Sequence, residues 1–142
     1  MPDTNQMTLL TEEQVLRAPS GDYMNDAQLA FFRARLSAML AEVQHARNDA
    51  TESLSNEITE ADPSDRATRE EERALELRSR DRDRNLAEKI SRALARIDAG
   101  TYGYCEETDE PIGIPRLLAR PTAELTIDAQ ERHERRKSTG SA

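Results

Sequence analysis

The sequence predicts a mostly α-helical protein in which a long antiparallel coiled-coil hairpin is followed by a small globular lobe and a C-terminal helix. Residues 25–61 and 66–99 contain neither glycine nor proline, and a short segment rich in turn-forming residues separates them. After residue 100 the composition changes abruptly, with several prolines and glycines in a short stretch. Of the 142 residues, 34% are charged and only 4% are aromatic, which favours an elongated helical protein over a compact enzyme with a large core.

The N-terminal segment, residues 1–23, has the weakest pattern. It contains Pro2, Pro19 and Gly21 around one short apolar patch at residues 7–10, and a short helical stretch is predicted from Glu12 to Arg17. We expect this segment to pack on the globular lobe rather than to form a domain.

The first long helix begins after Asn25, a plausible N-cap, and continues to Ala61. Apolar residues recur mostly at steps of three and four, as an amphipathic helix requires. They are Leu29, Phe32, Leu36, Met39, Val43, Ala50, Leu54 and Ile58.

A tight turn is expected at residues 62–65. Pro63 disfavours helical geometry at Asp62, and Ser64 or Asp65 can cap the next helix. The hairpin, residues 24–99, therefore has its tip at residues 61–67.

The second long helix is predicted from Arg66 to Ala99, where Gly100 ends it. Its middle, residues 78–85, alternates in charge, so we expect the pairing of the two arms to be partly polar there. The apolar stripe consists of Ala67, Ala74, Leu77, Leu86, Ile90, Ala93, Leu94 and Ile97.

Residues 100–142 form the predicted lobe and C-terminal helix. Residues 101–104 are expected to be extended, and the prolines and glycines that follow indicate loops. From Asp128 to about Lys137 the chain is predicted to be helical again, with basic residues at its C-terminal end, where they favour the helix dipole.

The composition excludes several classes of function. The net charge of −8 and the pI near 4.9 disfavour direct DNA binding. Apolar stretches are far shorter than the roughly 20 residues needed to cross a bilayer, so we expect a cytoplasmic protein. A phosphate-binding loop and a nucleophile motif are both missing, and His45 and His133 are expected to be exposed. The sequence therefore predicts a protein that is not an enzyme.

The turn between the helices resembles the coiled-coil tip of the DksA family, bacterial transcription factors that reach the active centre of RNA polymerase through its secondary channel. In that family two aspartates and a nearby alanine at the tip are functional, and here they are Asp62, Asp65 and Ala67. The start of the second helix, residues 70–82, is also similar. The resemblance is most specific in the lobe, which is similar to the family's zinc finger at residues 102–105, 112–114, 116–117 and 119–123.

The zinc ligands of that finger are lost. The family has two C-x-x-C pairs about seventeen residues apart, a strong sign of structural zinc. The four positions are Cys105, Thr108, Thr126 and Ala129 in this chain, and one thiolate cannot hold the metal. The chain thus resembles a single-cysteine, zinc-independent branch, and we expect no metal cofactor.

Packing and hydrogen bonds must then replace the metal. We expect Thr108 and Thr126 to bind backbone groups through their hydroxyls. A small core is expected from Tyr102, Tyr104, Ile112, Ile114, Leu117, Leu118, Leu125 and Ile127.

The resemblance implies a regulator of initiation, at ribosomal RNA promoters for example, that acts with guanosine tetraphosphate (ppGpp) in the stringent response. It assigns Lys89, Arg116 and Arg120 to a ppGpp site at the interface with the polymerase, although a usually basic position is Gln130 here. Without the resemblance, the tip aspartates would be helix caps and the three bases would be solvated side chains.

Two other classes of function stay open. The hairpin could be an adaptor that binds another protein, or Cys105 could serve a thiol or metal sensor. Binding to core polymerase tests the first, and the effect of chelators and peroxide tests the second. Cleavage factors of the Gre type use a similar hairpin, but we expect no transcript cleavage.

Overall fold

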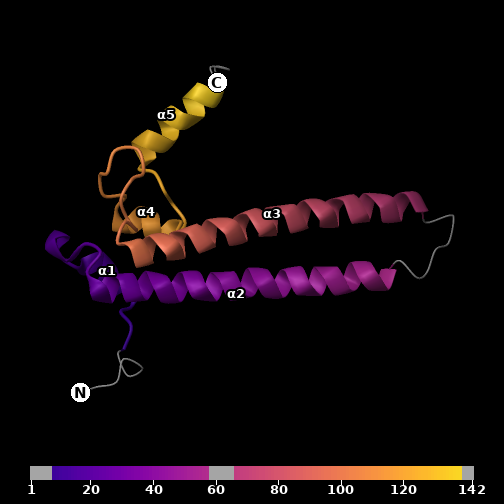
Figure 1. Ribbon diagram of the computed structural model, residues 1–142, viewed down its shortest axis with the longest axis horizontal. Helices are drawn as coiled ribbons and strands as arrows, with labels where there is room; N and C mark the ends of the chain where they lie inside the picture. Colours follow the sequence, from indigo (N-terminus) through magenta and orange to yellow (C-terminus); the bar gives the residue numbers. More distant parts are fainter. Residues whose placement is uncertain (1–7, 58–65, 139–142) are drawn as a thin grey trace. The chain divides into compact units, whose positions relative to one another are not determined.

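The computed structural model describes residues 8–57 and 66–138, and most of these residues are helical. The helices are α1 (Glu12–Arg17), the short 3-10 helix η2 (Ser20–Asp22), α2 (Asp26–Glu57), α3 (Arg66–Ala99), α4 (Ile114–Ala119) and α5 (Ile127–Ser138) (Figure 1). Contacts divide the chain into two compact units. One unit is Ser37–Ser91, and the other, here called the lobe unit, combines the described residues up to Leu36 with those from Arg92 onward.

Local signals set the ends of the long helices. The backbone N–H of Gln28 donates to Oδ1 of Asn25 at 2.9 Å, which confirms Asn25 as the cap of α2. Helix α3 has the predicted bounds, and Gly100 follows it with φ of +79°, a backbone conformation that glycine adopts readily. The turn predicted at residues 62–65 lies outside the described residues.

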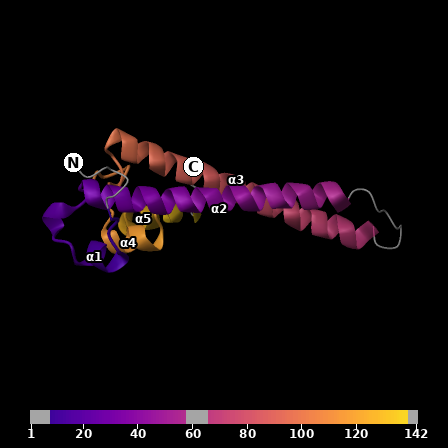
Figure 2. The same cartoon turned by 90° about the horizontal axis from the view of Figure 1, so that it is seen from below.

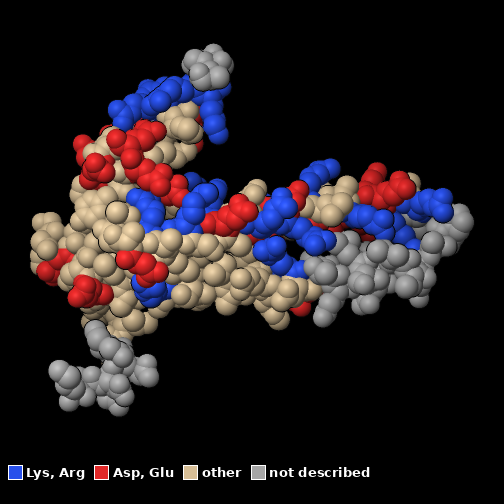
Figure 3. Space-filling model, viewed as in Figure 1, with Lys and Arg blue, Asp and Glu red and all other residues tan. Residues whose placement is uncertain are grey.

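In the unit Ser37–Ser91, the segments of α2 and α3 run side by side in opposite directions (Figures 1 and 2). Ala87 and Ile90 are buried at the base of this unit. The middle of α3 is different, because its half-buried residues include Ser79, Arg80 and Asp83, and basic and acidic side chains alternate along its surface (Figure 3). The half-buried face of α3 is thus polar in its middle, which agrees with the expectation of partly polar pairing.

Two members of the predicted apolar stripe of α3 are exposed. Leu77 is 47% exposed and Ala67 is also exposed. Both lie about 140° around the helix from the buried Ile90, because an α-helix advances about 100° per residue. The prediction that these two residues belong to the stripe was therefore wrong, and the buried face of α3 passes through polar residues instead.

The lobe unit has a continuous core to which the N-terminal segment contributes. Val15 of α1 is completely buried, and α1 contacts α4. The ring of Phe32 lies 5.6 Å from that of Tyr102, centroid to centroid. The core of this unit comprises Val15, Phe31, Phe32, Leu36, Ala93, Ile97, Tyr102, Cys105, Ile112, Leu117, Ala123 and Ala129.

The sequence-based expectation for the small core is confirmed for all but one residue. Tyr102, Ile112 and Leu117 are buried, and Tyr104, Ile114, Leu118 and Leu125 are half-buried. Ile127 is 56% exposed, so its assignment to the core was wrong. It is the first residue of α5, of which only Ala129 is buried.

The backbone of the lobe also differs from expectation in two places. Residues 114–119, expected to be loop, form α4, which has Pro115 in its first turn and Gly113 as its cap at φ of +103°. Residues 101–103, expected to be extended, form a turn in which the N–H groups of Thr101 and Tyr102 both donate to the carbonyl of Arg96, whereas Tyr104 forms an antiparallel bridge with Pro111. Within the described ranges, no helix is long and apolar enough to cross a membrane.

Candidate functional site

Two loops of the lobe unit lie together at the positions that the resemblance assigns to the zinc site. We call residues 104–111 the first knuckle and residues 124–129 the second knuckle. Backbone hydrogen bonds close the first knuckle on itself, from the N–H of Cys105 to the carbonyl of Glu110 at 2.8 Å and from the N–H of Asp109 to the carbonyl of Cys105 at 2.9 Å. The N–H of Glu106 donates to the carbonyl of Glu124 at 2.9 Å, which joins the two knuckles.

The four former ligand positions converge, and their remaining polar groups are hydrogen-bonded. Cys105 is 1% exposed and Ala129 is completely buried. The hydroxyl of Thr126 donates to the sulfur of Cys105 at 3.9 Å and accepts the backbone N–H of Ala129 at 3.2 Å. The hydroxyl of Thr108 accepts the N–H of Glu110 at 3.4 Å. Both threonines thus bind backbone groups as the sequence predicts.

This set of donors does not suit zinc. Structural zinc needs four thiolate or imidazole ligands, whereas this site offers one thiol, two hydroxyls and a methyl group. The Thr126 hydroxyl oxygen is already engaged as the cap of α5. Over the part of the chain that the structure describes, no group of three or more His, Cys, Asp or Glu residues could hold a metal ion.

The environment of Cys105 still favours its thiolate. Burial raises its pKa, but hydrogen bonds from the Thr108 hydroxyl and from the backbone N–H groups of Thr126, Thr108 and Glu107 outweigh that effect and lower the pKa from 9.0 to about 7. Backbone donors around a knuckle sulfur stabilise its negative charge whether or not a metal is bound. At 1% exposure, however, the sulfur has little access to a reactant in solution.

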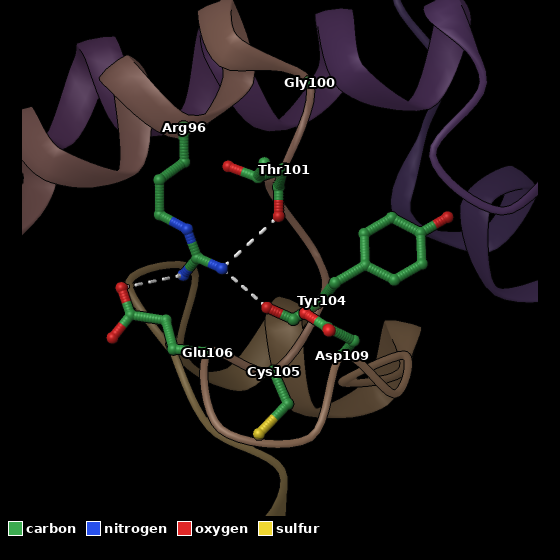
Figure 4. A pocket seen from close by; sticks show the side chains of 7 residues that line it. All are labelled: Arg96, Gly100, Thr101, Tyr104, Cys105, Glu106 and Asp109. Atoms are coloured by element: carbon green, nitrogen blue, oxygen red, sulfur yellow. Dashed lines mark hydrogen bonds and ion pairs between the residues drawn. The ribbon is translucent and has the colours of Figure 1, made fainter.

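Arg96, in the last turn of α3, holds the first knuckle from outside. Its Nη2 donates to the carbonyl of Tyr104 at 2.6 Å and to that of Thr101 at 3.3 Å, and its Nη1 lies 3.9 Å from a carboxylate oxygen of Glu106. The side chain is only 14% exposed. It lines a pocket of about 680 Å³ together with Gly100, Thr101, Tyr104, Cys105, Glu106 and Asp109 (Figure 4).

The second knuckle also has arginine partners. Arg116 of α4 is half-buried, and its Nε donates to the carbonyl of Leu125 at 2.9 Å. Arg92 of α3 pairs with Glu124 at 3.1 Å, but the Arg92 side chain is 58% exposed.

The site residues predicted from the resemblance do not all fall in one unit. Lys89 is exposed and belongs to the unit Ser37–Ser91, whereas Arg116 and the exposed Arg120 belong to the lobe unit. Ala67 is exposed in the first turn of α3. Asp62 and Asp65 lie outside the described residues. His45 and His133 are exposed, as expected.

Sequence reasoning missed two residues that organise the lobe. Arg96 is one, since a basic residue in the last turn of a helix is expected for the helix dipole alone. Tyr23 is the other: its hydroxyl donates to the carbonyl of Gly103 at 2.5 Å and accepts the N–H of Gly113 at 3.0 Å. A tyrosine in a segment of weak pattern carries no sequence signal for such distant partners.

Comparison with known proteins assigns both parts of the chain. Residues 28–97 match the family described as the N-terminal domain of DnaK suppressor protein DksA, and residues 100–135 match the prokaryotic dksA/traR C4-type zinc finger. The RNA polymerase-binding transcription factor DksA of Caulobacter vibrioides is 50% identical over 133 residues, which cover 92% of this chain and 93% of the relative. The chain belongs to the DksA family.

Other DksA proteins support the same assignment. The RNA polymerase-binding transcription factor DksA of Escherichia coli K12 is 44% identical over 79% of this chain and 75% of its own length. Among solved structures, the transcription factor DksA2 from Pseudomonas aeruginosa superposes with a TM-score of 0.83 at 42% identity, covering 90% of this chain and 99% of that one. All three relatives are named as transcription factors. The match to the C4-type finger persists although three of the four zinc cysteines are replaced.

Proposed function

We propose that this chain binds RNA polymerase directly and regulates transcription initiation without zinc. The observation that carries the proposal is the 50% identity, over nearly the whole chain, to a DksA that is named for polymerase binding. The family models match both the helical region and the finger region, which supports a function in transcription that needs both regions.

The hairpin is proposed to enter the secondary channel of the polymerase and to bring Asp62, Asp65 and Ala67 near the active centre. Polymerase catalysis uses two metal ions, so carboxylates at the tip would act on a cation-rich site and on the mobile elements beside it. The expected consequence is destabilisation of open promoter complexes.

The effector is proposed to be ppGpp, bound between this chain and the polymerase by Lys89, Arg116 and Arg120. Paired phosphates require several converging cations, and arginine suits them because it donates two parallel hydrogen bonds. Arg116 would bind the phosphates through its terminal Nη groups, because its Nε already donates to the carbonyl of Leu125. Lys89 and Arg120 are exposed and are the better residues to test.

Zinc independence is proposed from the chemistry of the donors. The hydroxyl of Thr126 is committed to the N–H of Ala129 and the sulfur of Cys105, so it acts as a structural hydrogen-bonding group rather than as a ligand. The two knuckles are joined by a backbone hydrogen bond that needs no metal.

The decisive experiment is transcription in vitro from a ribosomal RNA promoter with purified polymerase, with and without ppGpp, and with a chelator in parallel. We expect inhibition that ppGpp strengthens and the chelator does not change. Lys89→Ala and Arg120→Ala should weaken the effect of ppGpp, while the inhibition measured without ppGpp should stay unchanged. If the chain does not bind core polymerase, the adaptor alternative replaces this proposal.

The tip is tested by Asp65→Asn, which keeps the size of the side chain and removes its charge. We expect loss of promoter inhibition with polymerase binding largely retained. The matched control is Asp81→Asn, because Asp81 is a 66% exposed aspartate of α3 whose ion pair with Arg84 stays within the helix. Unchanged inhibition by the Asp65 variant would refute the role of the tip.

A further inference from the structure

The lobe unit holds its two knuckles in a similar way, each through an arginine on a backbone carbonyl. Arg96 binds the carbonyl of Tyr104, and Arg116 binds the carbonyl of Leu125. Tyr104 and Leu125 immediately precede Cys105 and Thr126, the first former ligand position of each knuckle. The two contacts therefore fix the peptide groups from which the metal ligands of a zinc finger would extend.

We propose that Arg96, supported by Arg116, positions the knuckles in the place of the missing metal. This inference rests on the proposed zinc independence of the chain. A zinc ion holds a finger from the inside by drawing four side chains to one point. The two guanidinium groups act from the outside, on the main chain, where their fixed planar geometry lets one side chain hold more than one acceptor.

Arg96 makes stronger contacts with the backbone than Arg116 does. One guanidinium nitrogen bridges the carbonyls of Thr101 and Tyr104, so it joins the turn that follows α3 to the start of the first knuckle (Figure 4). The side chain is 14% exposed and its bond to the Tyr104 carbonyl is partly buried, so water cannot easily replace that bond, whereas the bond to Thr101 is exposed. Hydrogen bonds that involve a charged group are roughly twice as strong as neutral ones, and a partly buried carbonyl such as that of Tyr104 loses stability when its donor is removed.

Arg92 provides a matched control. It lies one turn before Arg96 on the same helix and also contacts a knuckle, through its ion pair with Glu124 at 3.1 Å. Its side chain is 58% exposed, however, and exposed ion pairs contribute little to stability. Charge and helix position are thus similar in Arg92 and Arg96, whereas burial and carbonyl contacts differ.

The first test compares the thermal unfolding of the full chain with that of Arg96→Met, Arg96→Lys and Arg92→Met. We expect Arg96→Met to lower the midpoint by roughly 10 °C and Arg92→Met by roughly 3 °C or less. Arg96→Lys should recover only a minor part of the loss, because an ammonium group is not a planar fork. Equal losses for Arg92→Met and Arg96→Met, or full rescue by lysine, would overturn the proposal.

The second test restores the metal. Thr108→Cys, Thr126→Cys and Ala129→Cys together with Cys105 create four thiols, and zinc–sulfur bonds of ~2.3 Å place such sulfurs roughly 3.8 Å apart. The Thr126 oxygen and the Cys105 sulfur already lie 3.9 Å apart. With zinc bound, Arg96→Met should lower the midpoint by less than a third of its effect in the native chain, and a chelator should bring the full effect back.

If Arg96 had only a general packing role, Arg96→Met would lower the unfolding midpoint equally with and without zinc, and that result would overturn the proposal. If the four-cysteine chain takes up no zinc, the proposal is decided by the first test, in which the unfolding midpoints of Arg96→Met and Arg92→Met are compared in the native chain. Zinc independence itself fails only if a chelator unfolds the native chain. Because every readout is unfolding, the outcome is also separate from that of the polymerase experiments.

Discussion

Thr126→Val is the sharpest perturbation of the knuckle, because it removes one hydroxyl and keeps the shape of the side chain. That hydroxyl accepts the N–H of Ala129 at 3.2 Å, as the cap of α5, and donates to the sulfur of Cys105 at 3.9 Å. The variant therefore leaves the amide of Ala129, a completely buried residue, without its partner, and it removes one of several donors to the Cys105 sulfur.

The expected loss follows from those two bonds. Removing a threonine cap costs about 1 kcal/mol in most helices. The bond to sulfur is long and adds only a fraction of that amount, so we expect the free energy of unfolding to fall by about 1–2 kcal/mol. The pKa of Cys105 should rise only slightly, because most of the donors that lower it are backbone N–H groups that the variant keeps.

Urea denaturation followed by circular dichroism measures the loss, and hydrogen exchange at the amide of Ala129 reports on the start of α5 itself. Thr126→Ser is the control, since serine keeps the hydroxyl and caps helices equally well. Valine and serine variants with the same stability, or an Ala129 amide with unchanged exchange in the valine variant, would refute the reasoning.

Three further predictions concern the lobe unit. Because the pKa of Cys105 is lowered to about 7, the folded state favours the thiolate. Its stabilisation of about 2–3 kcal/mol is present above pH 9 and is lost as the pH falls through 7, so Cys105→Ser should flatten urea midpoints across that range. Burial, and to a lesser extent Tyr23, raises the pKa of Tyr102, so stability should fall above about pH 10. Tyr102→Phe should reduce that alkaline loss, and it should lower the free energy of unfolding at pH 7 by about 1 kcal/mol because the hydrogen bond from Tyr102 to the carbonyl of Pro121 is lost. Urea denaturation of both proteins as a function of pH measures the two effects. Val15→Ala should cost about 2 kcal/mol in urea denaturation if α1 is part of the core, whereas Leu16→Ala, at 53% exposure, should cost little.

The strongest sequence signals were those that depend on local chemistry. The absence of glycine and proline gave the correct bounds of α3, and Asn25 gave the start of α2, because caps and breakers act within one turn of the helix. The loss of cysteines at three of four positions revealed the altered finger directly, since zinc has strict requirements for its ligands.

Signals that depend on distant partners failed. Leu77 and Ala67 were placed in a buried stripe by spacing alone, but burial on α3 depends on what lies opposite each residue. The segment 114–119 is too short to show a periodic pattern, so the sequence did not predict α4. The exposed Ile127 shows that an apolar residue beside a core need not enter it.

The sequence by itself determined the two long helices, the polar middle of the second, the threonines that bind backbone groups and the family, because these depend on residue type and short spacing. Only the tertiary structure decided which backbone carbonyls of the knuckles Arg96 and Arg116 bind. Arg96 and Arg116 are ordinary bases in the sequence, and their contacts arise because folding brings each against a carbonyl five to nine residues away. A backbone carbonyl is present at every residue, so the sequence cannot indicate which one an arginine will bind.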